Sequence, residues 1–251
     1  MDPAPTHRAS LRRIRAGLDR RAVVTFSLAG SMLALHLASG AWDHLDGRGD
    51  LWGILYGDRS KEALILFGGR SRALVAEGEW WRLVSCGWLH AGPLHLTLNL
   101  TALFGLGPMC EAVFGRVRTL WLFLVAVIAG ATLSQIGGAP LAIGASGGVF
   151  GMMGALVAFG LVRGRNLHPE LRRLFGRQLW PWILLNLGIG LLVPGVDNLG
   201  HVGGLVAGLG FGVLSADLVT DNHRPAATAT WALGAASAGL LAWAVVGAVS
   251  S

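Results

Sequence analysis

The sequence predicts an all-α, polytopic membrane protein, a helical bundle with seven transmembrane helices. Of its 251 residues, 53% are hydrophobic and 14% are charged, whereas a soluble domain carries about 25% charged residues. The mean hydropathy is +0.57, and seven apolar runs approach the ~20 residues that a membrane-crossing helix needs. This composition excludes a water-soluble single-domain enzyme and a disordered tail protein, and two cysteines are too few for a disulfide scaffold.

The apolar runs divide the chain into three parts. They extend over residues 22–42, 94–114, 119–138, 146–162, 179–196, 199–218 and 229–249, the fourth and fifth being short. We expect an Arg-rich cytoplasmic tail over 1–21 and a six-helix core over 22–218, with a first outer loop at 43–93. A connector and an additional C-terminal transmembrane helix would occupy 219–251. The first run could instead be a cleaved secretory signal, although its apolar stretch exceeds the 7 to 15 residues that are usual for such signals.

The distribution of arginines predicts the orientation of the spans. Arginines gather in the N-terminal tail and in the connections after the second and fourth runs, while residues 138–145 contain no Lys or Arg. The positive-inside rule then places the N-terminus in the cytoplasm, and the composition favours a bacterial plasma membrane. Because the basic residues lie between apolar runs and not on one folded face, we expect contact with membrane lipids and no nucleic-acid partner.

Polar residues occur where the second, fourth and sixth spans begin, at a similar depth below the outer face. They are His95 and Asn99, Ser146, and His201. Polar groups at membrane depth are costly unless they face the protein interior or water, so they indicate a functional site.

The local spacing of these residues favours nucleophilic chemistry. His95 and Asn99 are four residues apart and therefore share one helical face. Ser146 lies in Gly144-Ala-Ser-Gly147-Gly148, a glycine-rich turn entering a helix, where free N–H groups suit an oxyanion. Phe150, one turn further, could pack against an imidazole ring.

Small residues recur at every fourth position of the fourth and sixth spans, at Gly147, Gly151 and Ala155 and at Gly200, Gly204, Gly208 and Gly212. Such stripes let two helix backbones approach closely in lipid. A hydrogen bond between a serine and a histidine on separate helices requires that approach.

These motifs together resemble the rhomboid family of intramembrane serine proteases. They are Trp81-Arg82, His90, His95 with Asn99, Glu111 with Gly115, Gly144-Ala-Ser146-Gly147, and His201-Val-Gly-Gly204, and they extend over more than half of the chain. The resemblance implies six core spans plus one additional C-terminal span. It also implies a serine endopeptidase that cleaves transmembrane segments of single-pass membrane proteins, with the fifth span as a lateral gate for the substrate.

The resemblance implies a role for each site residue. Ser146 would be the nucleophile and His201 the general base, a dyad without a carboxylate. His95, Asn99 and the backbone N–H of Ser146 would form the oxyanion hole. Gly144, Gly147, Phe150, His90, Trp81, Arg82 and Glu111 would support the site, with His90 as a structural partner of the first loop and Glu111 as a structural acceptor near the inner face. Neither a cofactor nor a metal is expected, and Gly200 departs from the alanine common in the family.

Other functions are alternatives to proteolysis. A catalytically silent rhomboid-like protein that binds transmembrane helices would show damage in the dyad, which is intact here. A transporter would need repeats and interior carboxylates along a pathway. A soluble α/β-hydrolase with Asp197 and His201 after the Gly-x-Ser-x-Gly motif would need a strand before the serine. A zinc site from His90, His95 and His201 has no supporting Asp, Glu or Cys nearby. His36 lies in the first span without an evident partner.

Overall fold

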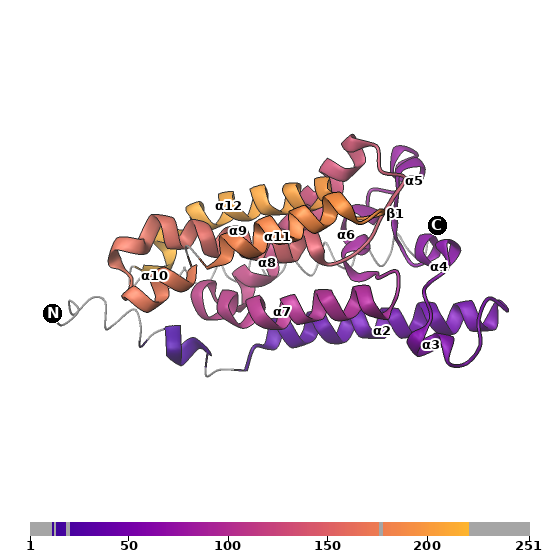
Figure 1. Ribbon diagram of the computed structural model, residues 1–251, viewed down its shortest axis with the longest axis horizontal. Coiled ribbons are helices and arrows are strands. Elements are labelled where there is room, and N and C mark those ends of the chain that lie inside the picture. Colours follow the sequence, from indigo (N-terminus) through magenta and orange to yellow (C-terminus); the bar gives the residue numbers. More distant parts are fainter. Residues whose placement is uncertain (1–11, 13, 19–20, 176–177, 221–251) are drawn as a thin grey trace.

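The computed structural model describes residues 12, 14–18, 21–175 and 178–220. Within these ranges the chain forms a bundle of long helices with one short two-stranded ladder (Figure 1). The predicted seventh run at 229–249 and most of the tail at 1–21 lie outside the described residues.

Five helices in the described part of the chain are long and apolar enough to cross a membrane. They contain α2 (Val23–Leu45), α7 (Pro93–Phe114), α8 (Arg116–Gly137), α9 (Ser146–Arg163) and α12 (Asn198–Thr220). Their ends lie within three residues of the predicted runs, because hydropathy over membrane length is a strong signal. The prediction of a polytopic helical bundle is confirmed.

The helix found at the fifth predicted span is shorter than its apolar run, residues 179–196. The helix α11 (Leu179–Leu192) has 14 residues and therefore extends about 21 Å at 1.5 Å per residue, which is less than the ~30 Å of a hydrocarbon core. It ends before Pro194 and Gly195, and the φ of Gly195 is +86°. Proline and a left-handed glycine end a helix even where the chain remains apolar.

The first outer loop is itself folded. It holds α3 (Gly53–Tyr56), α4 (Lys61–Leu66), β1 (Arg70–Ser71), α5 (Arg72–Ala76), α6 (Arg82–Ser85) and the 3-10 turn η1 (Cys86–Trp88). The labels α3, α4 and α5 gather at one end of the bundle, opposite α10 (Pro169–Phe175), which follows the turn η2 (Gly164–Asn166) (Figure 1). β1 pairs antiparallel with β2 (Leu141–Ala142), so the loop is joined to the connection that leads into α9.

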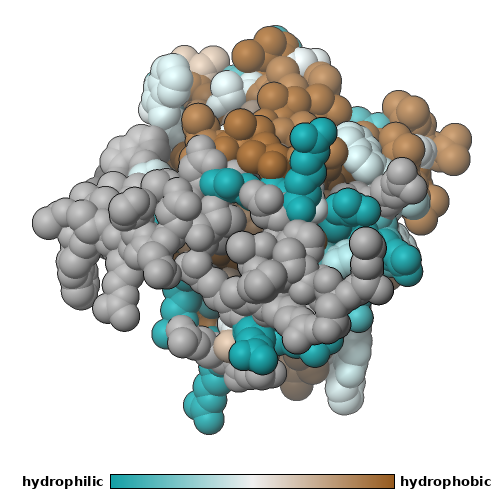
Figure 2. Space-filling model, turned by 90° about the vertical axis from the view of Figure 1, so that its left-hand side faces the viewer, coloured by the Kyte–Doolittle hydropathy of each residue, from teal (hydrophilic) through white to brown (hydrophobic). Residues whose placement is uncertain are grey.

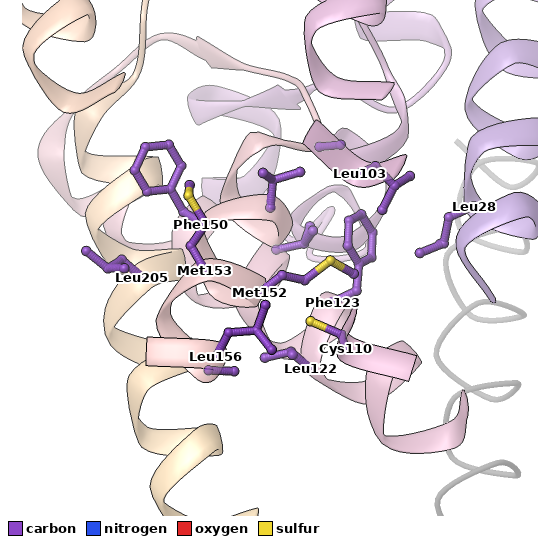
Figure 3. Close-up of a cluster of buried hydrophobic side chains, with 14 of the residues drawn as sticks. Leu28, Leu103, Cys110, Leu122, Phe123, Phe150, Met152, Met153, Leu156 and Leu205 are labelled. Atoms are coloured by element: carbon purple, nitrogen blue, oxygen red, sulfur yellow. The ribbon is translucent and has the colours of Figure 1, made fainter. Parts of the chain in front are cut away.

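The helix α9 occupies the centre of the bundle. Every residue from 148 to 160 is buried, as expected for a helix that is apolar all round. Its Met152 lies near Phe123 of α8 and Cys110 of α7 in the hydrophobic core (Figure 3). Seen from the end that carries α10, hydrophobic residues cover the upper part of the face and hydrophilic residues lie lower (Figure 2).

Glycines bring α9 and α12 into backbone contact. A Cβ built on Gly204 would overlap the carbonyl oxygen of Gly147, and one on Gly208 would overlap that of Gly151. The close approach predicted from the spacing of the small residues is therefore present. Any side chain at Gly204 or Gly208 would force the two helices apart.

Glu111 connects the end of α7 to the beginning of α2. Its carboxylate accepts hydrogen bonds from the backbone N–H of Thr25 (2.8 Å), the hydroxyl of Thr25 (2.7 Å) and the backbone N–H of Val24 (3.3 Å). The first N–H groups of a helix have no partner within the helix and carry positive partial charge, so a carboxylate stabilises them.

Candidate active site

Ser146 and His201 meet across the α9 and α12 interface. The Oγ of Ser146 lies 2.9 Å from Nε2 of His201. Ser146 is the first residue of α9, and His201 lies in the first turn of α12. Because the glycine contacts begin next to both residues, the same packing that joins the helices also sets this distance.

The imidazole of His201 is held by an aromatic ring. Phe150 stacks on it with ring centroids 4.4 Å apart and planes 11° apart, and His201 is buried, with 9% of its surface exposed. Its Nδ1 has no hydrogen-bond partner among the described residues. The carboxylate of Asp197 instead accepts from the backbone N–H of Gly200 (3.0 Å), so no carboxylate in the described part of the chain orients this imidazole through Nδ1.

The ring of His95 lies beside Gly144, near the serine. Its Nδ1 accepts a hydrogen bond from the backbone N–H of Ala91 (3.3 Å), which assigns the proton of the neutral ring to Nε2. A Cβ built on Gly144 would lie 2.8 Å from Nε2 of His95 and 3.9 Å from Oγ of Ser146. The space above Gly144 is therefore bordered by both groups, and its φ of +116° also requires glycine.

Asn99 and Ser146 supply two further N–H donors. The side-chain amide of Asn99 donates one N–H to the backbone carbonyl of His95 (3.0 Å), which leaves its second N–H for another acceptor. The backbone N–H of Ser146 opens α9, where the first four N–H groups have no partner within the helix.

His90 packs behind His95. The two ring centroids are 5.1 Å apart in an edge arrangement. Only 1% of the surface of His90 is exposed, and burial lowers its pKa to about 3, so the ring is neutral at physiological pH. His90 is therefore an uncharged packing neighbour of the His95 ring.

Trp81 and Arg82 hold the first outer loop together. The guanidinium of Arg82 donates to the carbonyls of Ile65 (2.5 Å) and Gly69 (3.1 Å) and pairs with Glu79 at 2.8 Å. It also lies over the buried Trp81 ring, 4.4 Å from the centroid. This motif ties α6 to the segment before β1.

A cavity of about 40 Å³ opens beside Ser146. Its walls include Gly144, Cys86, Asp197 and the small residue Gly130 of α8. A space above about 10–15 Å³ holds a water molecule, so the cavity has room for water or a small side chain. Burial raises the pKa of Cys86 to about 12, which keeps the thiol protonated and excludes it as a second nucleophile.

Over residues 12–220, as far as the structure describes them, no three His, Cys, Asp or Glu side chains are placed to hold a metal ion. His201 faces Ser146, while His90 faces His95.

Sequence reasoning missed a second buried polar group near the first loop. His36, which has no evident partner in the sequence, lies with Nε2 2.9 Å from Nη2 of Arg59. Arg59 also donates to the carbonyls of Gly53 (2.9 Å) and Ile54 (2.7 Å). A histidine within a span does indicate an interior partner, but nothing in the pattern identifies an arginine of the folded loop.

Comparisons with known proteins agree with this architecture. The Rhomboid domain family matches residues 77–217. Rhomboid protease GluP of Bacillus subtilis (strain 168) is 38% identical over 152 residues, covering 61% of this chain and 29% of the relative. RHOMBOID-like protein 5 of Arabidopsis thaliana is 39% identical over 152 residues, covering 59% and 48%. Rhomboid protease AarA of Providencia stuartii is 32% identical over 173 residues, covering 60% and 61%.

The match extends over more than half of the chain and includes Trp81, His95, Ser146 and His201. The chain spans less than two thirds of the length of each of these relatives. The apolar helices and the matched family agree on an integral, multi-pass membrane protein. The chain belongs to the rhomboid family.

Proposed function

We propose that this protein is an intramembrane serine endopeptidase that cleaves transmembrane segments of single-pass membrane proteins. Ser146 is the nucleophile and His201 the general base. The observation that carries the proposal is the 2.9 Å contact between Oγ of Ser146 and Nε2 of His201, on separate spans. That distance is within the range in which a base can take the hydroxyl proton.

The reaction begins when a carbonyl of the substrate reaches Ser146. His201 accepts the hydroxyl proton at Nε2 as Oγ attacks the carbonyl carbon, and it then returns the proton to the leaving amine. The acyl group stays on Ser146 until water, deprotonated by His201, releases it. Phe150 keeps the imidazole in place, since the stacked rings fix its plane without a carboxylate.

The oxyanion is stabilised by N–H donors of His95, Asn99 and Ser146. The Nε2–H of His95 faces the space above Gly144, and the free N–H groups of Asn99 and Ser146 complete the set of donors. Such donors act on the negative charge that develops in the transition state, and removing one typically costs about 3 kcal/mol.

The substrate would enter beside α11. This helix exposes large apolar side chains, including Trp182 and Leu185, which line a cavity with Gln178 and Pro181. A short span with few buried residues can move at low cost, so α11 would open as a lateral gate. We place the N-terminus in the cytoplasm of a bacterial cell and the dyad near the outer face of the plasma membrane, on the arginine distribution.

The test uses the full chain reconstituted into liposomes with a single-pass substrate. Ser146→Ala and His201→Ala should abolish cleavage, and a fluorophosphonate probe should label the wild type at Ser146. Ser39→Ala is the matched control, because Ser39 is a buried span serine whose hydroxyl bonds the carbonyl of His36. Full cleavage by Ser146→Ala would refute the proposal. A wild type that binds the substrate but neither cleaves it nor takes the probe would favour the catalytically silent alternative.

A further inference from the structure

Arg70 is a fully buried arginine that the dyad chemistry does not use. None of its surface is exposed. Its guanidinium donates to the hydroxyl of Ser134 (2.5 Å), the side-chain oxygen of Gln135 (3.0 Å) and the carbonyl of Ala139 (2.8 Å). All three acceptors lie in the last turn of α8 or just after it.

The backbone around Arg70 binds the next part of the same connection. Arg70 pairs with Ala142 in the β1 and β2 ladder. The N–H of Arg72 donates to the carbonyl of Pro140 (2.9 Å), and the side-chain amide of Gln135 donates to the carbonyl of Arg72 (3.0 Å). One short stretch of the first loop therefore holds the chain from the end of α8 to the end of β2.

This connection leads directly to the site. Gly144 follows β2 by two residues, and its N–H donates to the carbonyl of Cys86 (2.9 Å). Gly144 in turn borders Nε2 of His95 and precedes Ser146. A shift of β2 along β1 would thus move the glycine turn relative to the His95 ring.

Burial of Arg70 is unfavourable by itself. Burial lowers the pKa of Arg70, yet a guanidinium remains charged, and the three acceptors of its hydrogen bonds are neutral oxygens. An apolar side chain of similar volume would often be as stable or more stable at such a place. A planar guanidinium bonds several acceptors at once. It therefore defines the register of the segments that it joins, which an apolar side chain does not.

We propose that Arg70 is a positioning residue, which holds the connection 138–145 in the register that places Gly144 and Ser146 against His95. The catalytic part of this inference rests on the proposed protease activity. The structural part does not, so the two can be tested separately.

The experiment compares Arg70→Gln and Arg70→Lys in the reconstituted full chain. Arg59→Gln is the matched control, because Arg59 is also a buried first-loop arginine, with 6% of its surface exposed, and its guanidinium bonds to His36, Gly53 and Ile54, which lie outside the connection 138–145. Hydrogen exchange of peptides covering 138–146 reports the position of the connection without any cleavage. The kcat and KM for a single-pass substrate report the effect on catalysis.

We expect Arg70→Gln to speed hydrogen exchange in 138–146 and to lower kcat by about tenfold to a hundredfold, since misplacement by about 1 Å has effects of this size. The KM should stay within about twofold, because the substrate contacts remain. Arg70→Lys, which keeps the charge without the fork, should restore only part of kcat. Arg59→Gln should leave both exchange in 138–146 and kcat near wild type.

Ser134→Ala provides a milder variant in case Arg70→Gln fails to fold. It removes one acceptor and should lower kcat about threefold, the size of a single modest hydrogen bond. Unchanged exchange in 138–146, or unchanged kcat, in a folded Arg70→Gln or Ser134→Ala protein would overturn the inference. A wild type without proteolysis would refute the proposed function, while the exchange data would still decide whether Arg70 positions the connection.

Discussion

Replacing Gly204 by alanine tests whether the separation of α9 and α12 controls the activity. Gly204 lies one turn after His201 and faces Gly147, the neighbour of Ser146. A methyl group there would lie 2.7 Å from the carbonyl carbon and 3.0 Å from the Cα of Gly147, and it would overlap the carbonyl oxygen. Since carbon atoms pack at about 3.5–4.0 Å, the helices must separate by roughly 1 Å at the level of the dyad.

The expected loss follows from the geometry of the dyad. The 2.9 Å contact between Ser146 and His201 would lengthen beyond hydrogen-bond range, and a misplacement of about 1 Å lowers rates by about a hundredfold. Overpacking should also lower the free energy of unfolding by about 1–3 kcal/mol. We therefore expect kcat to fall about a hundredfold in a protein that is still folded.

Gly210→Ala is the matched control on the same helix. A Cβ on Gly210 would meet nothing within 4 Å, so kcat should be unchanged, and the helix should gain up to about 1 kcal/mol from the better propensity of alanine. The assay measures cleavage of a transmembrane substrate in liposomes, the labelling rate of Ser146 by a fluorophosphonate, and thermal unfolding. If folded Gly204→Ala matched Gly210→Ala in kcat and labelling rate, helix separation would not set the dyad and the reasoning would fail.

Four further substitutions test other contacts. His95→Ala and Asn99→Ala should each lower kcat about a hundredfold, the usual effect of losing an oxyanion donor, with little change in the unfolding temperature; equal rates for variants and wild type would remove these residues from the oxyanion hole. Phe150→Leu should lower kcat by about two- to tenfold, since stacked ring pairs contribute about 0.5–1.5 kcal/mol. An unchanged pH–rate profile together with unchanged kcat would show that the ring contact is dispensable. Glu111→Gln should destabilise the protein by about 1–3 kcal/mol, because the amide oxygen cannot replace both acceptor oxygens at the beginning of α2. The kcat of the folded fraction should stay normal. An unchanged unfolding temperature would argue against this capping role.

Much of the site was predictable because its residues lie on regular spans. Hydropathy places the ends of α7, α9 and α12, and the glycine periodicity predicts that α9 and α12 touch. A serine and a histidine at the same ends of two touching helices must then lie near each other. The stacking of Phe150 on His201 follows in the same way, one helical turn from Ser146.

The first outer loop could not be predicted in this way. Residues 46–92 contain no long periodic run, and their burial depends on contacts with distant segments, such as Arg70 with Ser134 or Arg59 with His36. The length of α11 also differs from its apolar run, because Pro194 and Gly195 end the helix regardless of hydropathy.

The sequence by itself determined where the chain is apolar enough to cross a membrane, which helices can approach closely, and which polar residues lie at the same depth. These features depend on local composition and on helical periodicity, which can be read along the chain. Only the tertiary structure decided which ring nitrogen of His95 borders the space above Gly144, that Asp197 bonds the backbone and not the imidazole, and that the buried Arg70 holds the turn before the serine. Those features depend on the directions of side chains from segments far apart in sequence, and a direction in space exists only once the helices are packed.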